Sequence, residues 1–441
     1  MKTENIKNEN RQGVSRRQFL SNSMAATAAV AAFPYVMTRP AFGAEGTDGI
    51  RLGVIGTGGQ GRGHMNQSLV FKNVVAVCDV DDNMLAEGRK RIEDKTKRTP
   101  ATYKDYRKML EKENLDAVII CTPDHWHALQ TIDACAAGLH VFVEKPMALT
   151  IRETQLMVKA ARKYNVVVQN GSMQRSMSGF REACEYVRNE YLGEVKVVRV
   201  GLPGVNYNQP FRPNTNPPPE LDYDMWLGPA PWRPYNQNHV HYNFRFFWDF
   251  ACGQMSNWGA HHLDIAQWGL GMDESGPVQI SARCEYDPQK RYEVPSWFEV
   301  DYRYANGARI ICGQSQRDGT TFEGQDGTLW VNRGKIQCSV NGVLGTPLQD
   351  DEIHLYKSNN HHQDWYNCIL GGKDANGEYK KPICDVAIGH HSTTVCNLGT
   401  IASRTGRTIK WDPVKEEIIG DKEASWYMDY EYRAPWKLPT L

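Results

Sequence analysis

The sequence predicts an α/β domain followed by an α+β domain: first a doubly wound parallel sheet, then an open-faced mixed or antiparallel sheet. Between residues 50 and 170, short apolar runs alternate with stretches of helical periodicity, which is typical of a βαβ series. A glycine-rich turn follows the first of these runs. After residue 190, apolar and polar residues alternate instead, as in strands with one exposed face.

Each element of the first domain follows from one of these runs. Strands are predicted at RLGVIG, NVVAVCDV, DAVIICT, HVFVEK and VVVQN. Right-handed crossovers place such strands in one parallel sheet with helices on both faces, and ligands bind where the strands end. The motifs discussed below for this half all lie at such strand ends.

The second domain is predicted from a later group of strand-like runs. After a helical segment at residues 176–189, these are GEVKVVRV, VQISARCEY, SWFEVDYRY, ARIICGQSQ and TLWVN. Segments 363–370 and 386–404 have helical spacing and are expected to pack back toward the first domain. The predicted divisions are a leader at 1–44, a cofactor domain at 45–171, a substrate and oligomerisation domain at 172–421, and a tail at 422–441.

Composition limits the class of protein. Of 441 residues, 41% are hydrophobic and 23% charged, enough to bury a sizeable core. Lys plus Arg and Asp plus Glu both total 51, so no net field favours nucleic acid as a partner. The 11 cysteines form no C-x-x-C pair, and those in apolar runs, such as Cys78 and Cys121, are interpreted as small core residues.

The amino terminus predicts export. Residues 15–20 read SRRQFL, an apolar stretch covers 24–36, and small residues follow up to Ala44. This pattern is typical of a twin-arginine signal, with cleavage near Ala44 rather than membrane anchoring. We therefore expect the twin-arginine translocase to carry the folded chain, with its cofactor already bound, into the periplasm.

A dinucleotide-binding motif follows the first predicted strand. Gly56, Gly58 and Gly61 form G-x-G-x-x-G, with Gln60 inside the turn. The first glycine permits the tight turn, the second allows close approach of a pyrophosphate, and the third allows helix–strand packing. Asp79 ends the second strand, where a carboxylate binds ribose hydroxyls and repels a 2′-phosphate. The motif predicts a Rossmann fold that binds NAD in preference to NADP.

Three further segments carry a resemblance to a known family. They are TPDHWHA at 122–128, EKPMALT at 144–150 and CGQMSNWGAHHLD at 252–264. With the glycine motif, they make the chain resemble the Gfo/Idh/MocA family (glucose-fructose oxidoreductase, inositol dehydrogenase and MocA-like proteins) over almost all of its length after the leader. The resemblance implies a Rossmann domain, an open-faced sheet that often forms a dimer or tetramer contact, and a nicotinamide between the domains.

The resemblance also implies roles for residues near the nicotinamide. Lys145 matches the family's active-site lysine, which contacts both cofactor and substrate; physically, an ammonium there stabilises a developing alkoxide. The other residues implied to contact cofactor or substrate are Thr122, Pro123, His127, Glu144, Gln174 and Arg175.

His261 matches the family's histidine that takes the hydroxyl proton, and its ordinary pKa suits a general base. Four residues earlier, where relatives commonly carry Asp, stands Asn257. An amide can bind a hydroxyl or orient His261 but cannot take a proton. His261 is therefore predicted to be the base, with Asp264 and His262 as candidate helpers.

Two other residue groups have competing interpretations. Trp226, Trp232 and Trp248 could line a carbohydrate pocket or be buried in the core, and Trp248 is predicted to contact substrate. Histidine pairs occur at 261–262, 361–362 and 390–391. Because adjacent helical positions diverge by about a hundred degrees, neighbours rarely bind one metal ion, and no metal site is predicted.

Three functions fit the sequence. The first is oxidation of a secondary hydroxyl of a sugar, glycoside or polyol by bound NAD, giving a keto sugar. The second is an NAD-dependent glycosidase that oxidises a ring carbon transiently, eliminates the aglycone and then reduces the ring. The third is a non-catalytic, NAD-holding sugar-binding protein. The sequence does not separate the first two, and it names neither the sugar nor the carbon.

Overall fold

The computed structural model describes residues 49–441. The predicted export signal at residues 1–44 lies outside this described part of the chain. Among residues 49–441, none of the helices combines the length and the apolar character needed to cross a membrane.

The first domain is built on a six-stranded parallel sheet in the order β3-β2-β1-β4-β5-β6. Its strands are short and rich in valine, isoleucine and alanine, as expected for strands covered on both faces. The strands are β1 (Leu52–Ile55), β2 (Val74–Cys78), β3 (Ala101–Tyr103), β4 (Ala117–Ile120), β5 (His140–Val143) and β6 (Val168–Asn170). The helices are α2 (Gly59–Asn66), α3 (Ser68–Phe71), α4 (Asp82–Thr96), α5 (Tyr106–Lys112), α6 (Asp124–Ala136) and α7 (Ile151–Tyr164).

Local residues set the ends of the helix that follows the EKP motif. Thr150 accepts a hydrogen bond from the Glu153 backbone, and the Glu153 side chain accepts one from the Thr150 backbone. This capping box satisfies two amides that the first helical turn leaves free. The helix ends at Asn165, which adopts a left-handed conformation. Helix α7 therefore begins directly after the EKP motif and fixes the position of that motif.

The second domain contains a nine-stranded sheet in the order β13-β12-β11-β7-β10-β9-β8-β14-β15. All its pairs are antiparallel except β7 with β10. Its strands are β7 (Val195–Gly201), β8 (Gln279–Tyr286), β9 (Pro295–Arg303), β10 (Arg309–Gly313), β11 (Gly319–Gly324), β12 (Thr328–Asn332), β13 (Lys335–Cys338), β14 (Ile409–Asp412) and β15 (Glu417–Ile418). The fold class predicted from the sequence is confirmed.

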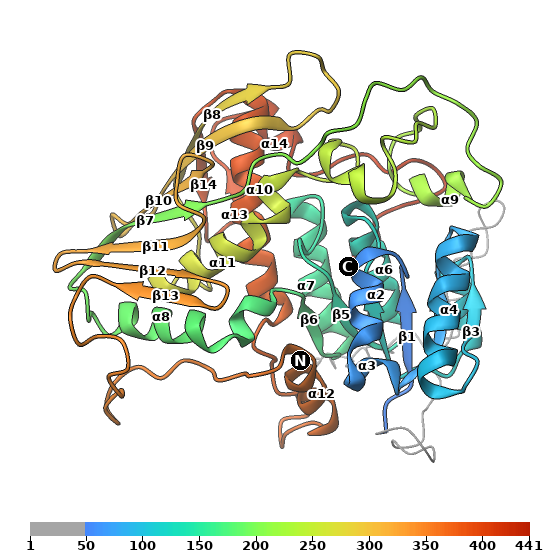
Figure 1. The fold of residues 1–441 in the computed structure, drawn as a ribbon, viewed down its shortest axis with the longest axis horizontal. Coiled ribbons are helices and arrows are strands. Elements are labelled where there is room, and N and C mark those ends of the chain that lie inside the picture. Colours follow the sequence, from blue (N-terminus) through green and yellow to red (C-terminus); the bar gives the residue numbers. More distant parts are fainter. Residues whose placement is uncertain (1–48) are drawn as a thin grey trace, which may run out of the picture. The chain divides into compact units, whose positions relative to one another are not determined.

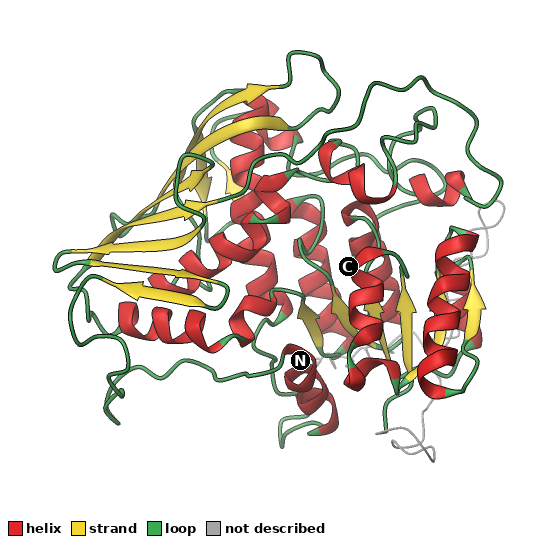
Figure 2. Ribbon diagram, viewed as in Figure 1, coloured by secondary structure: helices red, strands yellow, loops and turns green. Residues whose placement is uncertain are grey.

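Helices cover one face of this sheet (Figures 1 and 2). Those in contact with its strands include α8, α11 and α13. The helices of this part are α8 (Ser178–Arg188), α9 (Tyr223–Leu227), α10 (Gln254–Asn257), α11 (Gly259–Leu270), α12 (His361–Leu370), α13 (Val386–Thr405) and α14 (Lys422–Trp426), with 3-10 helices at Met173–Ser176 and His241–Phe246. Partly exposed ion pairs such as Arg199–Glu323 and Arg309–Asp301 lie between neighbouring strands of the sheet.

Two late segments return to the first domain. Trp365 and Ile369 of α12 are buried in the same apolar cluster as residues of β1 and β2, which confirms the expected packing of that helix. Farther along, the Trp436 ring lies 4.8 Å from the Trp126 ring of α6, and the Tyr432 hydroxyl donates to Glu153 of α7. The predicted tail thus completes the core of the cofactor domain.

Candidate functional site

The glycine turn after β1 leaves open space where a dinucleotide phosphate would lie. Gly56 has φ +86°, and a Cβ on it would lie 2.8 Å from the Cys121 backbone. A Cβ on Gly61 would lie 1.9 Å from the Gly56 oxygen, so helix α2 packs too closely for any side chain. A Cβ on Gly58 would meet nothing within 4 Å. The turn therefore has no room for a side chain at Gly56 and Gly61, and it is open toward the cavity at Gly58. This arrangement fits a pyrophosphate at the start of α2.

This asymmetry predicts the effect of alanine substitutions in the turn. Gly58→Ala should leave the melting temperature of the cofactor-free chain unchanged, because its methyl group meets no protein atom. It should weaken NAD binding by about tenfold or more, because the methyl group occupies space that the phosphate needs. Calorimetric titration and thermal melting check this. Gly63→Ala, exposed on the same helix with its nearest neighbour 3.9 Å away, should leave NAD binding unchanged. Its melting temperature should not fall, because alanine favours a helix more than glycine does. Equal losses of NAD affinity in both variants would contradict the assignment.

Asp79 stands at the end of β2 in the same cavity. Its carboxylate accepts hydrogen bonds from the Thr57 backbone at 2.7 Å, from the Thr57 hydroxyl at 3.1 Å and from the Asp81 backbone at 3.1 Å. Burial raises the pKa of Asp79, and these donors oppose that rise. The carboxylate is thus oriented by the turn itself and is available to the ribose of a dinucleotide.

Replacing Asp79 by serine should relax the preference for NAD. Loss of the carboxylate removes both the acceptor for ribose hydroxyls and the charge that repels a 2′-phosphate. We expect the ratio of NAD affinity to NADP affinity to fall by about tenfold. Asp82→Ser is the matched control, because Asp82 is exposed at the start of α4 and pairs with Lys104. An unchanged ratio in Asp79→Ser would remove the role assigned to this residue.

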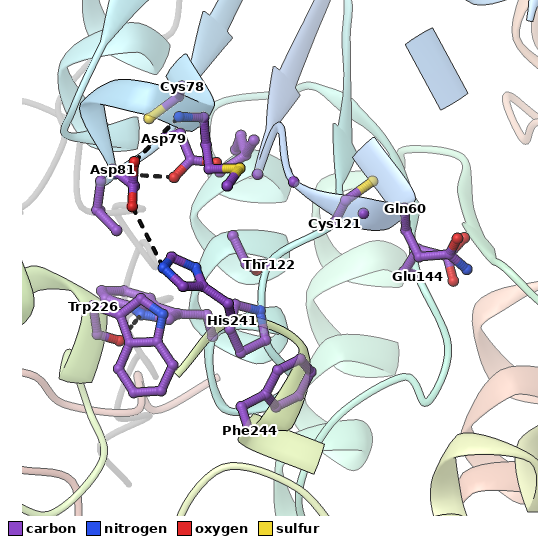
Figure 3. A pocket seen from close by; sticks show the side chains of 18 of the residues that line it. Gln60, Cys78, Asp79, Asp81, Cys121, Thr122, Glu144, Trp226, His241 and Phe244 are labelled. Atoms are coloured by element: carbon purple, nitrogen blue, oxygen red, sulfur yellow. Dashed lines mark hydrogen bonds and ion pairs between the residues drawn. The ribbon is translucent and has the colours of Figure 1, made fainter. Parts of the chain in front are cut away.

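A segment of the second domain covers the same cavity. Its backbone joins the first domain through the Asp82 amide, which donates to the Glu220 oxygen at 3.0 Å, and the Asp222 amide, which donates to the Val80 oxygen at 3.0 Å. His241 lies 3.5 Å from the Asp81 carboxylate, and Figure 3 shows the two side chains pointing toward each other. The residues that this segment adds to the lining are Met225, Trp226, His241, Tyr242, Phe244 and Arg245. Trp226, predicted either to line a pocket or to be buried, is 4% exposed and lines this cavity, whereas Trp232 is 68% exposed and does not. The other residues of this cover were not predicted from the sequence.

The predicted nicotinamide end of the cavity is held by hydrogen bonds from α6 to the turns that follow β4 and β5. His127 Nδ1 lies 2.9 Å from the Pro146 oxygen and its Nε2 lies 2.8 Å from the Thr122 oxygen. His127 thereby ties the TPDH turn to the EKP turn. Thr122, Pro123, His127, Glu144 and Lys145 all line the cavity, as do Gly56, Gly58, Gln60 and Asp79; Gly61 and Gln174 do not.

Glu144 and His64 form a buried pair beside this end. His64 Nε2 lies 2.8 Å from the Glu144 carboxylate, and His64 Nδ1 lies 2.7 Å from His362 Nε2. Although burial opposes both charges, Cys121 and Glu144 raise the pKa of His64 to about 10, and His64 lowers the pKa of Glu144 to about 2. The pair fixes Glu144, whose carboxylate also accepts from the Lys145 amide.

Lys145 and Asn257 are brought together from the two domains. The Lys145 ammonium donates to the Asn257 backbone oxygen at 2.8 Å and to its side-chain oxygen at 2.9 Å. Burial lowers the pKa of Lys145 to about 8, against the opposing effect of Glu144. Asn257 is thus a partner of the lysine, a role that spacing along the chain alone does not indicate.

His261 lies one turn after Asn257 and is 6% exposed. Its Nδ1 is buried with no hydrogen-bond partner among the described residues. Burial lowers the pKa of His261 far below 6.5, and the charges of Lys145 and Arg333 lower it further. The imidazole is therefore neutral near pH 7, and it is a weaker proton acceptor than an ordinary histidine.

The remaining predicted substrate residues have other contacts. Arg175 and Asp264 are almost fully buried and bind each other at 2.8 Å. Arg175 also binds Asp273 at 2.7 Å, so neither Arg175 nor Asp264 faces the cofactor cavity. Gln174 accepts a hydrogen bond from Arg333 at 3.2 Å. Trp248 lines a different cavity, described below.

Two acids that line the cofactor cavity, Asp81 and Asp124, were not predicted from the sequence. Asp124 is 5% exposed and begins α6, directly after Pro123. Burial raises its pKa to about 7, against the attraction of Arg245 and Lys145. The indication was present in TPDH, because an acid at the start of a helix that follows a parallel strand faces the ligand edge of the sheet.

The other histidines and the cysteines have structural contacts. His390 lies 2.7 Å from Glu416 and 2.7 Å from the Thr154 hydroxyl. His390, His391 and Glu416 are the group within the described residues whose ligand atoms, all within 4.8 Å of one another, could hold a metal ion. The 11 cysteines, all within the described residues, are unpaired.

Comparisons with known proteins agree with this geometry. Residues 50–172 match the family described as "Oxidoreductase family, NAD-binding Rossmann fold", and residues 205–438 match "Oxidoreductase family, C-terminal alpha/beta domain". The WlbA dehydrogenase from Bordetella pertussis, solved with NADH and UDP-GlcNAcA, shares the fold with a TM-score of 0.59 at 19% identity, over 82% of this chain and 99% of that one.

Curated relatives are similar over shorter stretches. Glycosyl hydrolase family 109 protein 2 of Shewanella sp. (strain ANA-3) is 32% identical over 212 residues, 44% of this chain and 44% of the relative. Myo-inositol 2-dehydrogenase of Thermotoga maritima is 29% identical over 153 residues, 34% of this chain and 44% of the relative. The chain thus spans less than half the length of these relatives. With both halves matched, it belongs to the Gfo/Idh/MocA oxidoreductase family, and residues 50–172 are its NAD-binding Rossmann domain.

Proposed function

We propose that the chain oxidises a secondary hydroxyl of a sugar, glycoside or polyol to the ketone. The observation that carries this proposal is the position of Lys145. It lines the cofactor cavity and contacts Asn257, one helical turn before the neutral imidazole of His261. The charge of Lys145 also acts on His261, although His261 is not itself among the residues that line the cavity.

These residues have complementary roles in the proposed reaction. His261 takes the proton of the substrate hydroxyl, since burial keeps its imidazole neutral. The Lys145 ammonium stabilises the negative charge that develops on the same oxygen. Asn257 orients the lysine through two hydrogen bonds. Bound NAD supplies the hydride acceptor, and Gly58, Asp79 and Thr122 are among the residues that would hold it.

The pH dependence of kcat/KM follows from these two groups. Lys145 acts as the ammonium, and its pKa is lowered to about 8, so activity should fall as the pH rises through about 8. His261 acts as the neutral base, and its pKa lies far below 6.5, so it should cause no loss between pH 5 and 7. Rates measured from pH 5 to 10 check both. In Lys145→Arg the side chain stays protonated over this range, so kcat/KM should no longer fall above about pH 8, whatever its absolute value. An unchanged fall in this variant would contradict the assignment.

The test of the function is incubation with a panel of sugars and methyl or nitrophenyl glycosides, with products identified by mass spectrometry. A ketone product formed with one equivalent of NADH per bound NAD supports the proposal. Release of free sugar without net NADH supports the second candidate, a redox-neutral glycosidase. If no substrate of the panel gives either a ketone or a free sugar, both candidate functions are contradicted.

The glycosidase is kept as a second candidate because of Asp124 and the glycosyl hydrolase family 109 relatives. Elimination of an aglycone needs a proton donor, and a buried carboxyl with a pKa of about 7 is partly protonated at neutral pH. If Asp124 serves as this acid, Asp124→Asn abolishes aglycone release and spares oxidation of a free sugar. Equal effects on both reactions would contradict this role.

We further propose that the chain acts in the periplasm as a homo-oligomer and retains its NAD. The segment at residues 220–245 covers the cavity and is bound to the first domain beside Asp81 and Asp82, which supports slow cofactor release. Cell fractionation, mass by light scattering and NAD content after gel filtration test the three parts. Cytoplasmic retention, a monomer, or nucleotide-free protein would each overturn the corresponding part.

A further inference from the structure

A second cavity lies against one face of helix α13. Asn397, Thr400, Ile401 and Arg404 follow each other at intervals of three, one and three residues and all line it. This spacing places them on one side of a helix. The cavity has a volume of about 400 Å³, within the range of ligand sites. It shares no lining residue with the cofactor cavity.

Aromatic side chains form much of the wall of this α13 cavity. The Arg404 guanidinium lies 4.9 Å from the Trp248 ring centre and 4.5 Å from that of Tyr427. Trp426 also lines the cavity and is 74% exposed. With Trp248 and Tyr427 on the same wall, Trp426 belongs to a group of aromatic rings and is not a single exposed one. Such rings suit the C–H faces of a sugar.

The wall also carries hydrogen-bonding groups of both kinds. Asn397 is 3% exposed, and its side-chain nitrogen is a donor with no partner among the described residues. Arg404 adds further donors, and none of the ion pairs of residues 49–441 includes it. Asp249 and Asp429 line the cavity as acceptors. A buried donor without a partner is costly, so a ligand oxygen at Asn397 would remove that cost.

This chemistry selects one class of ligand. Sugar hydroxyls both donate and accept hydrogen bonds, and a pyranose ring presents an apolar face to an aromatic ring. Asp249 is paired with Arg233, as is Glu293 in the adjoining hollow. Arg404 and Asp429 then carry opposite charges on the wall, so no excess charge favours a charged ligand over a neutral one.

We propose that the α13 cavity is a second binding site, which takes a neutral pyranose ring and is separate from the catalytic site. Trp426 and Tyr427 contact the ring face, Asn397 and Arg404 donate to its oxygens, and Asp429 accepts from its hydroxyls. The site requires no hydride transfer, so it stands independently of the proposed oxidation. It would hold one unit of a glycan while the catalytic site acts elsewhere.

The test measures binding of four probes to the NAD-loaded chain by saturation-transfer NMR: the methyl pyranosides of glucose, galactose, mannose and N-acetylglucosamine. The variants are Trp426→Ala and Arg404→Ala, both of exposed residues, and thermal melting confirms that each is folded. The matched controls are Phe211→Ala, at another exposed aromatic residue, and Arg283→Ala, at another exposed arginine. At least one probe should bind the wild type, weaken by at least about fivefold in both variants, and stay unchanged in both controls.

Measurement of the same probe in Lys145→Ala separates the two sites. Saturation transfer that survives in Lys145→Ala and falls in Trp426→Ala supports the second site, even if no sugar is ever oxidised. The proposal is overturned if no probe binds, or if binding depends on Lys145 alone. It is also overturned if Trp426→Ala leaves binding intact but converts an oligomer to a monomer in light scattering, because the face is then a contact between copies of the chain.

Discussion

Replacing Lys145 by alanine should lower kcat by about 10²–10³-fold, the usual cost of removing one preorganised donor from a developing oxyanion. The substitution removes the ammonium that donates to Asn257. KM should change much less, because the interaction is strongest in the transition state. NAD affinity should also change little, since the phosphate turn and Asp79 lie on other strands.

The measurement is steady-state kinetics with the best substrate of the panel, together with NAD titration. Lys163→Ala is the control, because Lys163 is exposed on α7 and lies over the Tyr164 ring. Full activity in Lys145→Ala would dismiss catalysis by this site and leave the third interpretation, a protein that holds NAD and sugar without reacting them. Loss of NAD binding together with activity would instead make the lysine a cofactor residue.

Replacing Arg175 by methionine should destabilise the chain by about 3–5 kcal/mol, the cost of breaking a buried ion pair from one side. Asp264 is fully buried, and without the arginine its carboxylate keeps only the Ser392 hydroxyl at 2.6 Å. Asp273 loses its partner as well. The arginine is therefore expected to hold the 3-10 helix at Met173–Ser176 against α11.

Urea unfolding of the cofactor-free chain measures this effect. Arg283→Met removes an exposed arginine, which pairs with Glu299 on the sheet, and should cost less than about 1 kcal/mol. The family resemblance implied that Arg175 contacts substrate. A variant with unchanged stability but a raised KM would restore that role and contradict the structural one.

The parts of the site that the sequence predicted are those set by local backbone geometry. Gly56 and Gly61 need the absence of a Cβ because β1 and α2 approach within one turn, and this requirement is readable from spacing alone. The position of Asp79 was likewise predictable, because this residue directly follows β2. Lys145 was placed by the resemblance, and the position of its motif at the end of β5 agrees with it.

The parts that were missed depend on contacts between distant residues. Spacing does not show that Asn257 binds a lysine 112 residues earlier, or that His241 covers the cavity beside Asp81. Strand β11 was missed because it is short and has glycine at both ends, yet it pairs with β7 along most of its length. Local patterns thus predicted the fold class and the phosphate turn, whereas the cover of the cavity needed the tertiary structure.

The return of the last residues to the first domain has a consequence for biosynthesis. Trp436 packs on Trp126, and Trp365 enters the core beside β1 and β2. A nascent chain that has released only its first half from the ribosome therefore lacks pieces of its nucleotide-binding core. Co-translational folding often completes an amino-terminal domain early, whereas here the contacts of Trp365 and Trp436 can form only after those later residues have also been synthesised.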